Sequence, residues 1–188
     1  MREGIDYIIY GRISRDDISN QFVIEYIFEE TNNVVGVAEV HGGSGNPAPY
    51  TALGVLRGME ASAAKAFGSE SLRGKQVSVQ GVGAVGWHLV KLLTEAGASI
   101  FYTDINEQNI ERIKNDFPQA KFVGTDEIHK VKCDVYAPCA LGATINDETI
   151  RSLQCKVVCG SANNQLAEDR HGDQLKELGI IYAPDYLV

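Results

Sequence analysis

The chain has 188 residues, of which 44% are hydrophobic and 22% are charged. These proportions are ordinary for a globular protein, and the length suits one domain, or one domain plus a fragment, with a core of its own. The net charge of −8 and the lack of a basic cluster argue against nucleic acid or an anionic membrane surface as a partner. We find no signal-peptide pattern and no apolar run near 18 residues, so we expect a cytoplasmic protein.

The first half of the sequence predicts a hinge followed by a long helix. Residues 1–40 contain the strand-like DYIIYGRIS and the segment VIEYIFEE, and look too short to be a domain. HGGSGNPAP (41–49) has three glycines and two prolines in nine residues, a composition typical of a linker or hinge. Residues 50–67 then predict a strong helix whose inward-facing residues are Leu53, Leu56, Met59, Ala63 and Phe67.

From residue 75 onward, strand-like and helix-like segments alternate. Short apolar, β-prone runs are expected to form strands at 75–80, 99–103, 121–123, 133–138, 156–160 and 180–184. Helical spacing follows the first two runs, with an end at Gly97, and shorter helical pieces are expected at 146–153 and 169–178. This alternation predicts an α/β, Rossmann-like, doubly wound and mostly parallel sheet with helices on both faces.

Four cysteines lie in or beside these apolar runs: Cys133, Cys139, Cys155 and Cys159. They form no close CxxC pair, and no histidine pair lies near them at ligand spacing, so we expect no metal site. We interpret them as reduced, buried thiols.

Three glycines, Gly81, Gly83 and Gly86, interrupt the point where the first strand passes into its helix. In a G-x-G-x-x-G pattern the first glycine allows a tight turn and the second lets the backbone approach a pyrophosphate. The third lets helix and strand pack closely. The helix N-terminus adds free N–H groups and the positive end of its dipole. Taken alone, the pattern also fits a turn that only packs tightly.

Asp104 ends the second strand, 18 residues past Gly86, where an acid can accept a hydrogen bond from the adenosine ribose 2′-OH. The alternative is a carboxylate that caps the helix that follows. Strand, glycines, helix, strand and acid in this order predict a dinucleotide site. A 2′-phosphate about 6 Å from Asp104 would be repelled by roughly 3 kcal/mol, on the order of a hundredfold in affinity. Ile105 and Asn106 bring no compensating cation, so we predict NAD as the cofactor.

Several longer motifs carry a wider resemblance. GGSGNPAPYTALGVLRGM, QGVGAVG, YTDIN, CDVYAPCALGATINDETI, GSANNQL and RHGDQLKELGIIYAPDY together resemble the glutamate/leucine/phenylalanine/valine dehydrogenase family, its leucine dehydrogenases most of all. The likeness runs from about residue 24 to Val188. It implies reversible, NAD-dependent oxidative deamination of a branched-chain L-amino acid such as leucine to its 2-oxo acid. The implied partners are these small molecules, and a full-length relative is compatible with a homo-oligomer.

The resemblance also implies roles for particular residues. Thr51 would reach the nicotinamide carboxamide, unless it is an ordinary threonine of a helix N-terminus. Asn163 and Asn164 would bond the nicotinamide ribose or the substrate, although one of them can instead be a turn residue. For Cys139 a buried core thiol is the alternative to a place in the cofactor cleft. The implied cofactor-binding set is Thr51, Gly81, Val82, Gly83, Ala84, Val85, Gly86, Asp104, Ile105, Cys139, Ala140, Leu141, Asn163 and Asn164.

The chain also departs from the family pattern. The family's catalytic domain supplies two lysines before the hinge, whereas the first lysine here is Lys65. Residues 1–40 are interpreted as a relic of the end of that domain, with Asp17 as the best match to its catalytic acid, although Ser19 stands where a glycine is expected. Residues 41–49 are then the hinge and 50–188 a C-terminally truncated NAD-binding domain. We therefore expect NAD binding without turnover; the alternative is a non-catalytic NAD-binding module or a truncated remnant.

Overall fold

The structure is a computed structural model that describes residues 45–187. By its contacts the chain divides into two units, Met1–Pro47 and Ala48–Val188, and the second is the one described below. The segments DYIIYGRIS and VIEYIFEE, the hinge up to residue 44, and Asp17 lie outside the described residues. The proposed domain boundaries therefore stay a prediction.

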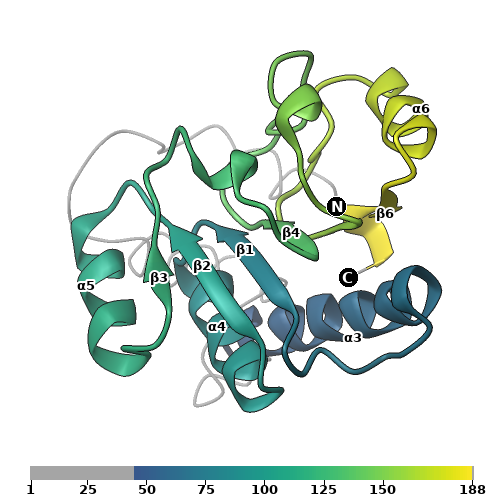
Figure 1. The fold of residues 1–188 in the computed structure, drawn as a ribbon. Helices are drawn as coiled ribbons and strands as arrows, with labels where there is room; N and C mark the ends of the chain where they lie inside the picture. Colours follow the sequence, from purple (N-terminus) through teal and green to yellow (C-terminus); the bar gives the residue numbers. More distant parts are fainter. Residues whose placement is uncertain (1–44, 188) are drawn as a thin grey trace, which may run out of the picture. The chain divides into compact units, whose positions relative to one another are not determined.

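The described unit is built on one six-stranded parallel sheet with the strand order β3-β2-β1-β4-β5-β6 (Figure 1). The strands are β1 (Gln76–Gln80), β2 (Ser99–Thr103), β3 (Lys121–Phe122), β4 (Val135–Pro138), β5 (Val157–Cys159) and β6 (Ile181–Ala183). All six predicted strands are present, and β1 lies between β2 and β4. The predicted doubly wound Rossmann-like fold is confirmed.

Helices and short 3₁₀ turns connect the strands. The helices are α3 (Ala48–Phe67), α4 (Ala84–Glu95), α5 (Glu107–Asp116) and α6 (Arg170–Glu177), and the 3₁₀ turns are η2 (Ile128–Lys130), η3 (Ile150–Ser152) and η4 (Asp185–Leu187). The prediction of a helix at 146–153 is wrong, because only the 3₁₀ turn η3 forms there. The Asn146 side chain accepts hydrogen bonds from the N–H groups of Glu148 and Thr149, and such side-chain bonds compete with a continuing helix.

Side chains of the sheet alternate between two apolar cores, one on each face. In β4, Val135 and Ala137 belong to the core that also contains α3 and α4, whereas Tyr136 belongs to the other. Ile113 of α5 joins the first core, and Leu175 of α6 joins the second. Helices therefore cover both faces, as a sheet buried on both sides requires.

Helix α3 buries a slightly different face from the predicted one. Its buried residues are Ala48, Ala52, Val55, Leu56, Met59, Ser62 and Ala63. Leu53, predicted to face inward, is 41% exposed, and Phe67 is half-buried against the edge of the core. Alanine and glycine surround the larger side chains of α3, so hydrophobic spacing did not locate the centre of the buried stripe.

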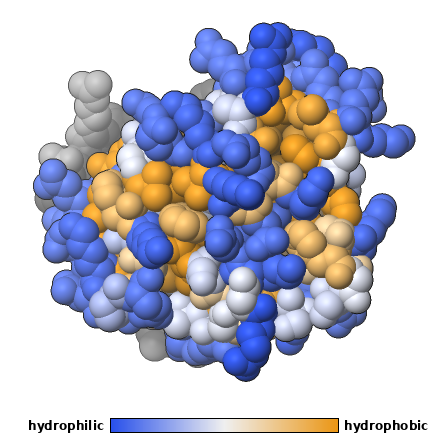
Figure 2. Space-filling model, viewed as in Figure 1, coloured by the Kyte–Doolittle hydropathy of each residue, from blue (hydrophilic) through white to orange (hydrophobic). Residues whose placement is uncertain are grey.

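Within residues 45–187, no helix is long and apolar enough to cross a membrane. Hydrophobic residues reach the surface in separate patches on a largely hydrophilic face (Figure 2). Large apolar side chains that are exposed include Ile105 and Leu141, both among the predicted site residues.

Candidate functional site

Most of the predicted site residues within the described part of the chain follow different strands and lie at one edge of the sheet. Gly81 follows β1, Asp104 follows β2, Cys139 follows β4, and Asn163 lies in the loop after β5. Because all strands are parallel, these are all carboxyl ends. The chain leaves β1 towards β2 on one side and returns to β4 on the other, so the strand order reverses between β1 and β4. In open α/β sheets, ligands bind in the crevice at such a point.

The three glycines differ in the space around them. Gly81 has φ +94°, and a Cβ there would lie 2.8 Å from the Cβ of Ala140. A Cβ on Gly86 would lie 2.1 Å from the carbonyl oxygen of Gly81. A Cβ on Gly83, by contrast, would meet nothing closer than Asn109 Nδ2, at 3.9 Å. The outer glycines therefore shape a tight turn, whereas the middle one faces open space.

Helix α4 begins at this turn without a side-chain cap. Its N-cap residue, Gly83, makes no capping hydrogen bond, and no acidic residue lies in the first turn. Helix α5 differs, because the side chain of its N-cap residue Asn106 accepts a hydrogen bond from the Gln108 N–H. The first N–H groups of an α-helix have no partner within the helix, and they favour an anion. The start of α4 therefore fits a phosphate group.

The carboxylate of Asp104 joins the glycine turn to the end of β2. Its Oδ2 accepts hydrogen bonds from the Val82 N–H at 2.8 Å and from Asn109 Nδ2 at 3.2 Å. Its Oδ1 accepts from the Asn106 N–H at 2.8 Å. Asn106 is the N-cap residue of α5, and Asp104 accepts a hydrogen bond from the N–H of this cap residue rather than from an N–H of the helix.

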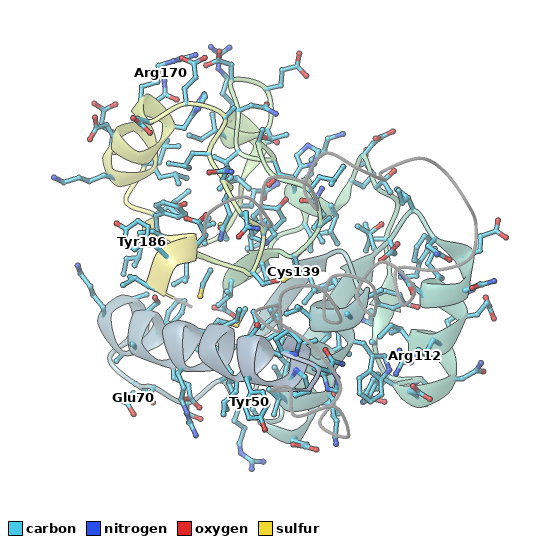
Figure 3. The ribbon with its side chains drawn as sticks, turned by 180° about the vertical axis from the view of Figure 1, so that it is seen from behind. Tyr50, Glu70, Arg112, Cys139, Arg170 and Tyr186 are labelled. Carbon is cyan, nitrogen blue, oxygen red and sulfur yellow. The ribbon has the colours of Figure 1, made fainter. Side chains whose placement is uncertain are left out.

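The loop after β4 lies against the same turn. Cys139 donates its N–H to the carbonyl oxygen of Gln80 at 2.7 Å, and Ala140 contacts Gly81. Desolvation raises the pKa of the Cys139 thiol, and hydrogen bonds with Ser161 offset this only in part. A neutral thiol is a poor nucleophile, so Cys139, labelled in Figure 3, fits a packing residue rather than a reacting group. Leu141 points into solvent, with 82% of its surface exposed.

The two asparagines in the loop after β5 differ in backbone conformation. Asn164 has φ +51°, a left-handed conformation that Asn tolerates. Its N–H donates to Asp185 Oδ2 at 2.7 Å, and its carbonyl oxygen accepts from the Ala143 N–H at 2.7 Å. Both backbone groups of Asn164 are thus fixed. Asn163 and Asn164 both lie in the turn and both are exposed, so the predicted ligand contact of either one stays a prediction.

Thr51 lies in the first turns of α3. This helix ends at Phe67, before the chain enters β1. The contact between Cys159 Sγ and the carbonyl oxygen of Val55, at 3.5 Å, fixes the helix beside β5. Ile105 follows Asp104 and is 88% exposed. Asp17 lies outside the described residues, so its predicted role is untested.

Comparison with known proteins identifies the family. The model of the glutamate/leucine/phenylalanine/valine dehydrogenase family matches residues 42–103 and 98–188. The chain belongs to this family. Leucine dehydrogenase of Thermoactinomyces intermedius is 57% identical over 165 residues, and that of Bacillus subtilis is 54% identical over 165 residues. Each alignment covers 88% of this chain but 45% of the relative, so this dehydrogenase-family chain spans about half the length of the curated relatives it matches.

A solved structure shares the fold. L-tryptophan dehydrogenase from Nostoc punctiforme superimposes with a TM-score of 0.75 at 36% sequence identity, over 92% of this chain and 48% of that one. The likeness therefore extends to the three-dimensional arrangement of this dehydrogenase-family chain.

Four residues that shape the site of this dehydrogenase-family chain were not predicted from the sequence: Asn109, Gly142, Gly160 and Asp185. A Cβ on Gly142 would lie 2.4 Å from the carbonyl oxygen of Asn163, and one on Gly160 would lie 2.1 Å from that of Pro138. These glycines let the two loops approach each other. Asp185 closely follows β6, as Asp104 follows β2, and that parallel could have identified it. The position of Asn109 gave no such signal.

Two other features of this dehydrogenase-family chain lie apart from the predicted residues. A pocket of about 230 Å³ between η3 and α6 is lined by Asp147, Ile150, Arg151, Gln174, Glu177 and Leu178, none of them a predicted site residue. Arg170 hydrogen-bonds the carboxylate of Asp147 and lowers its pKa to about 2. Among residues 45–187 no group of His, Cys, Asp and Glu side chains is placed to hold a metal ion.

Proposed function

We propose that this chain carries the NAD-binding domain, C-terminal in the whole enzyme, of an amino-acid dehydrogenase of the leucine dehydrogenase type. The reaction would be oxidative deamination of a branched-chain L-amino acid such as leucine to its 2-oxo acid. One observation carries the proposal: an uncapped helix start with an open middle glycine lies at the carboxyl end of β1, with the Asp104 carboxylate bonded to its backbone. Bound NAD would accept the hydride from the substrate Cα.

The adenosine half of the cofactor would lie over β1 and β2. The open face of Gly83 lets a pyrophosphate approach the backbone, and the first N–H groups of α4 donate to its oxygens. Asp104 accepts hydrogen bonds from the ribose hydroxyls. Ile105, which is 88% exposed, offers an apolar side chain beside the ribose. An exposed apolar side chain next to an acid suits a ligand that is both apolar and hydroxylated.

The nicotinamide half would lie over β4 and β5. Leu141, 82% exposed beside the crevice, would cover the ring and exclude water, while Cys139 packs below it. Asn163, held by the fixed turn at Asn164, would bond the nicotinamide ribose or the substrate. Thr51, at the start of α3, would bond the carboxamide.

We further propose that the 188-residue chain, taken alone, binds the cofactor but does not turn over substrate. In the proposed reaction one lysine polarises the reacting water or carbonyl and a second pairs with the substrate carboxylate, and the sequence has no lysine before Lys65. Losing a positioned acid–base group costs about 10²–10⁴-fold in rate. Losing the substrate carboxylate's partner adds to that cost.

Two measurements on the purified 188-residue chain test the proposal. Titration calorimetry with NAD should show saturable binding, and absorbance at the NADH band with L-leucine should show no turnover. Turnover close to that of a full-length leucine dehydrogenase would refute the claim of inactivity. Absence of NAD binding at millimolar cofactor would refute the cofactor site.

A second candidate is a non-catalytic NAD-binding module, for which the uncapped helix start and the Asp104 carboxylate would suffice. Sedimentation of the chain with and without NAD separates the two. A module that reports on NAD should change its association state when the cofactor binds, whereas a domain of an enzyme should not.

A further inference from the structure

We propose that Asn109 is an additional cofactor-binding residue, whose carboxamide holds the Asp104 carboxylate in the free chain and turns to a hydroxyl of the adenosine ribose when the cofactor binds. The inference rests on the proposed function and extends it to a residue outside the glycine turn and the β2 acid. It follows from where the amide lies and from the number of hydrogen bonds that Asp104 can accept.

The Asn109 side chain lies between the two parts of the adenosine site. It is half-buried in the first turn of α5, and its Nδ2 donates to Asp104 Oδ2 at 3.2 Å. The same nitrogen is the nearest group to the open face of Gly83, 3.9 Å from the position of a Cβ there. A ribose held by Asp104, with its pyrophosphate over Gly83, would therefore pass beside this amide.

The number of hydrogen bonds that Asp104 can accept determines what Asn109 does when a ribose binds. A carboxylate offers about four acceptor positions. Three donors already use it: the N–H groups of Val82 and Asn106 and the amide of Asn109. A ribose that donates both hydroxyls needs two positions, so one donor must yield. The two backbone N–H groups are held by the chain, whereas the Asn109 side chain can rotate.

When the Asn109 amide turns away from Asp104, its N–H can donate to the oxygen of a ribose hydroxyl. Asp104 can only accept hydrogen bonds, and each ribose hydroxyl can also accept one. Asn109 thus supplies the donor that the acid lacks. The exchange conserves hydrogen bonds, because the amide N–H leaves a carboxylate oxygen and meets a hydroxyl oxygen.

Local helix stability does not account for Asn109. Asn is a weaker helix former than Ala, and the cap of α5 is Asn106. The neighbouring Gln108 carries an amide of the same kind on an exposed position of the same turn. Gln108→Ala is therefore a matched control, since it removes an amide and adds helix propensity without touching Asp104.

The test measures dissociation constants of the full 188-residue chain, as wild type, Asn109→Ala and Gln108→Ala. The ligands are NAD, 2′-deoxy-NAD, 3′-deoxy-NAD and nicotinamide mononucleotide, which has no adenosine ribose. We expect Asn109→Ala to weaken NAD about three- to tenfold, the range of one hydrogen bond, and Gln108→Ala to leave it unchanged. With one of the two deoxy analogues the loss should disappear, because the hydroxyl that Asn109 contacts is missing.

The other outcomes overturn the proposal in distinguishable ways. If wild-type chain binds NAD and Asn109→Ala binds it equally well, Asn109 has no part in the site. An equal loss with NAD and both deoxy analogues shows that Asn109 only shapes the protein and contacts no hydroxyl. A loss with nicotinamide mononucleotide as well points to a general structural defect. Failure of the wild-type chain to bind NAD rejects the proposed function itself.

Discussion

Alanine substitutions at two glycines of the turn should separate folding from cofactor binding. A Cβ on Gly86 would lie 2.1 Å from the backbone oxygen of Gly81, so the helix and the strand end must move apart. A Cβ on Gly83 would meet nothing closer than 3.9 Å, but it would occupy the space assigned to the pyrophosphate. Gly86→Ala should therefore damage the fold, and Gly83→Ala should damage binding.

The two magnitudes follow from these contacts. Forcing a methyl group against backbone costs about 3 kcal/mol, which lowers the Tm of a chain this long by about 6–12 °C. Gly83 is the N-cap of α4, where Ala is less favourable than Gly by about 1 kcal/mol at most. The same methyl group in the path of the pyrophosphate should weaken NAD binding by about tenfold or more, since overpacking costs about 1–3 kcal/mol.

Differential scanning fluorimetry and NAD titration on each variant measure both effects. Gly124→Ala is the control, because a Cβ there meets nothing within 4 Å and Gly124 lies outside the site. It should change neither quantity. Wild-type NAD affinity in Gly83→Ala would refute the assignment of this open face to the cofactor. Wild-type stability in Gly86→Ala would refute the packing argument.

Three further predictions concern the acid, the asparagine turn and the thiols. Asp104→Ser should reduce the preference for NAD over NADP by about tenfold or more, measured as the ratio of the two dissociation constants; an unchanged ratio contradicts the repulsion argument. Asp185→Ala should cost about 1 kcal/mol in urea unfolding, because the Asn164 N–H loses its acceptor, and Asp185→Asn should recover most of it. Burial raises the pKa of Cys155 and of Cys159 to about 12. Burial also raises the pKa of Cys133 and of Cys139. The unfolded thiols ionise first as pH rises above about 9, so the free energy of unfolding should fall by about 1.4 kcal/mol for each of the four thiols between about pH 8 and 10. Cys159→Ala should remove about a quarter of that fall, and a flat profile would contradict the burial.

Local chemistry was enough to predict much of the fold. Strands and helices alternate with periods that depend only on neighbouring residues, and the glycine that ends α4 was visible as Gly97, which has φ +78°. The spacing of Gly81, Gly83 and Gly86 also predicted the turn, because a tight turn needs glycine at fixed positions along the chain.

Some predictions failed where local signals compete or where the burying partner is distant. Residues 146–153 have helical composition, but the side chains of Asn146 and Thr149 take the backbone bonds that a helix needs. Leu53 is apolar, yet it lies outside the stripe of α3 that the sheet and α4 cover.

By itself the sequence determined the order of the elements, the glycine turn and the acid that follows β2, since each depends on residues close together in the chain. Only the tertiary structure decided that Asn164 takes a left-handed conformation, that Asn109 meets Asp104, and that Asp185 fixes the loop after β5. The physical reason is that parallel strands bring their carboxyl ends to one edge of the sheet, and the loops that follow them form hydrogen bonds there. Residue spacing along the chain does not predict which loop residues come into contact.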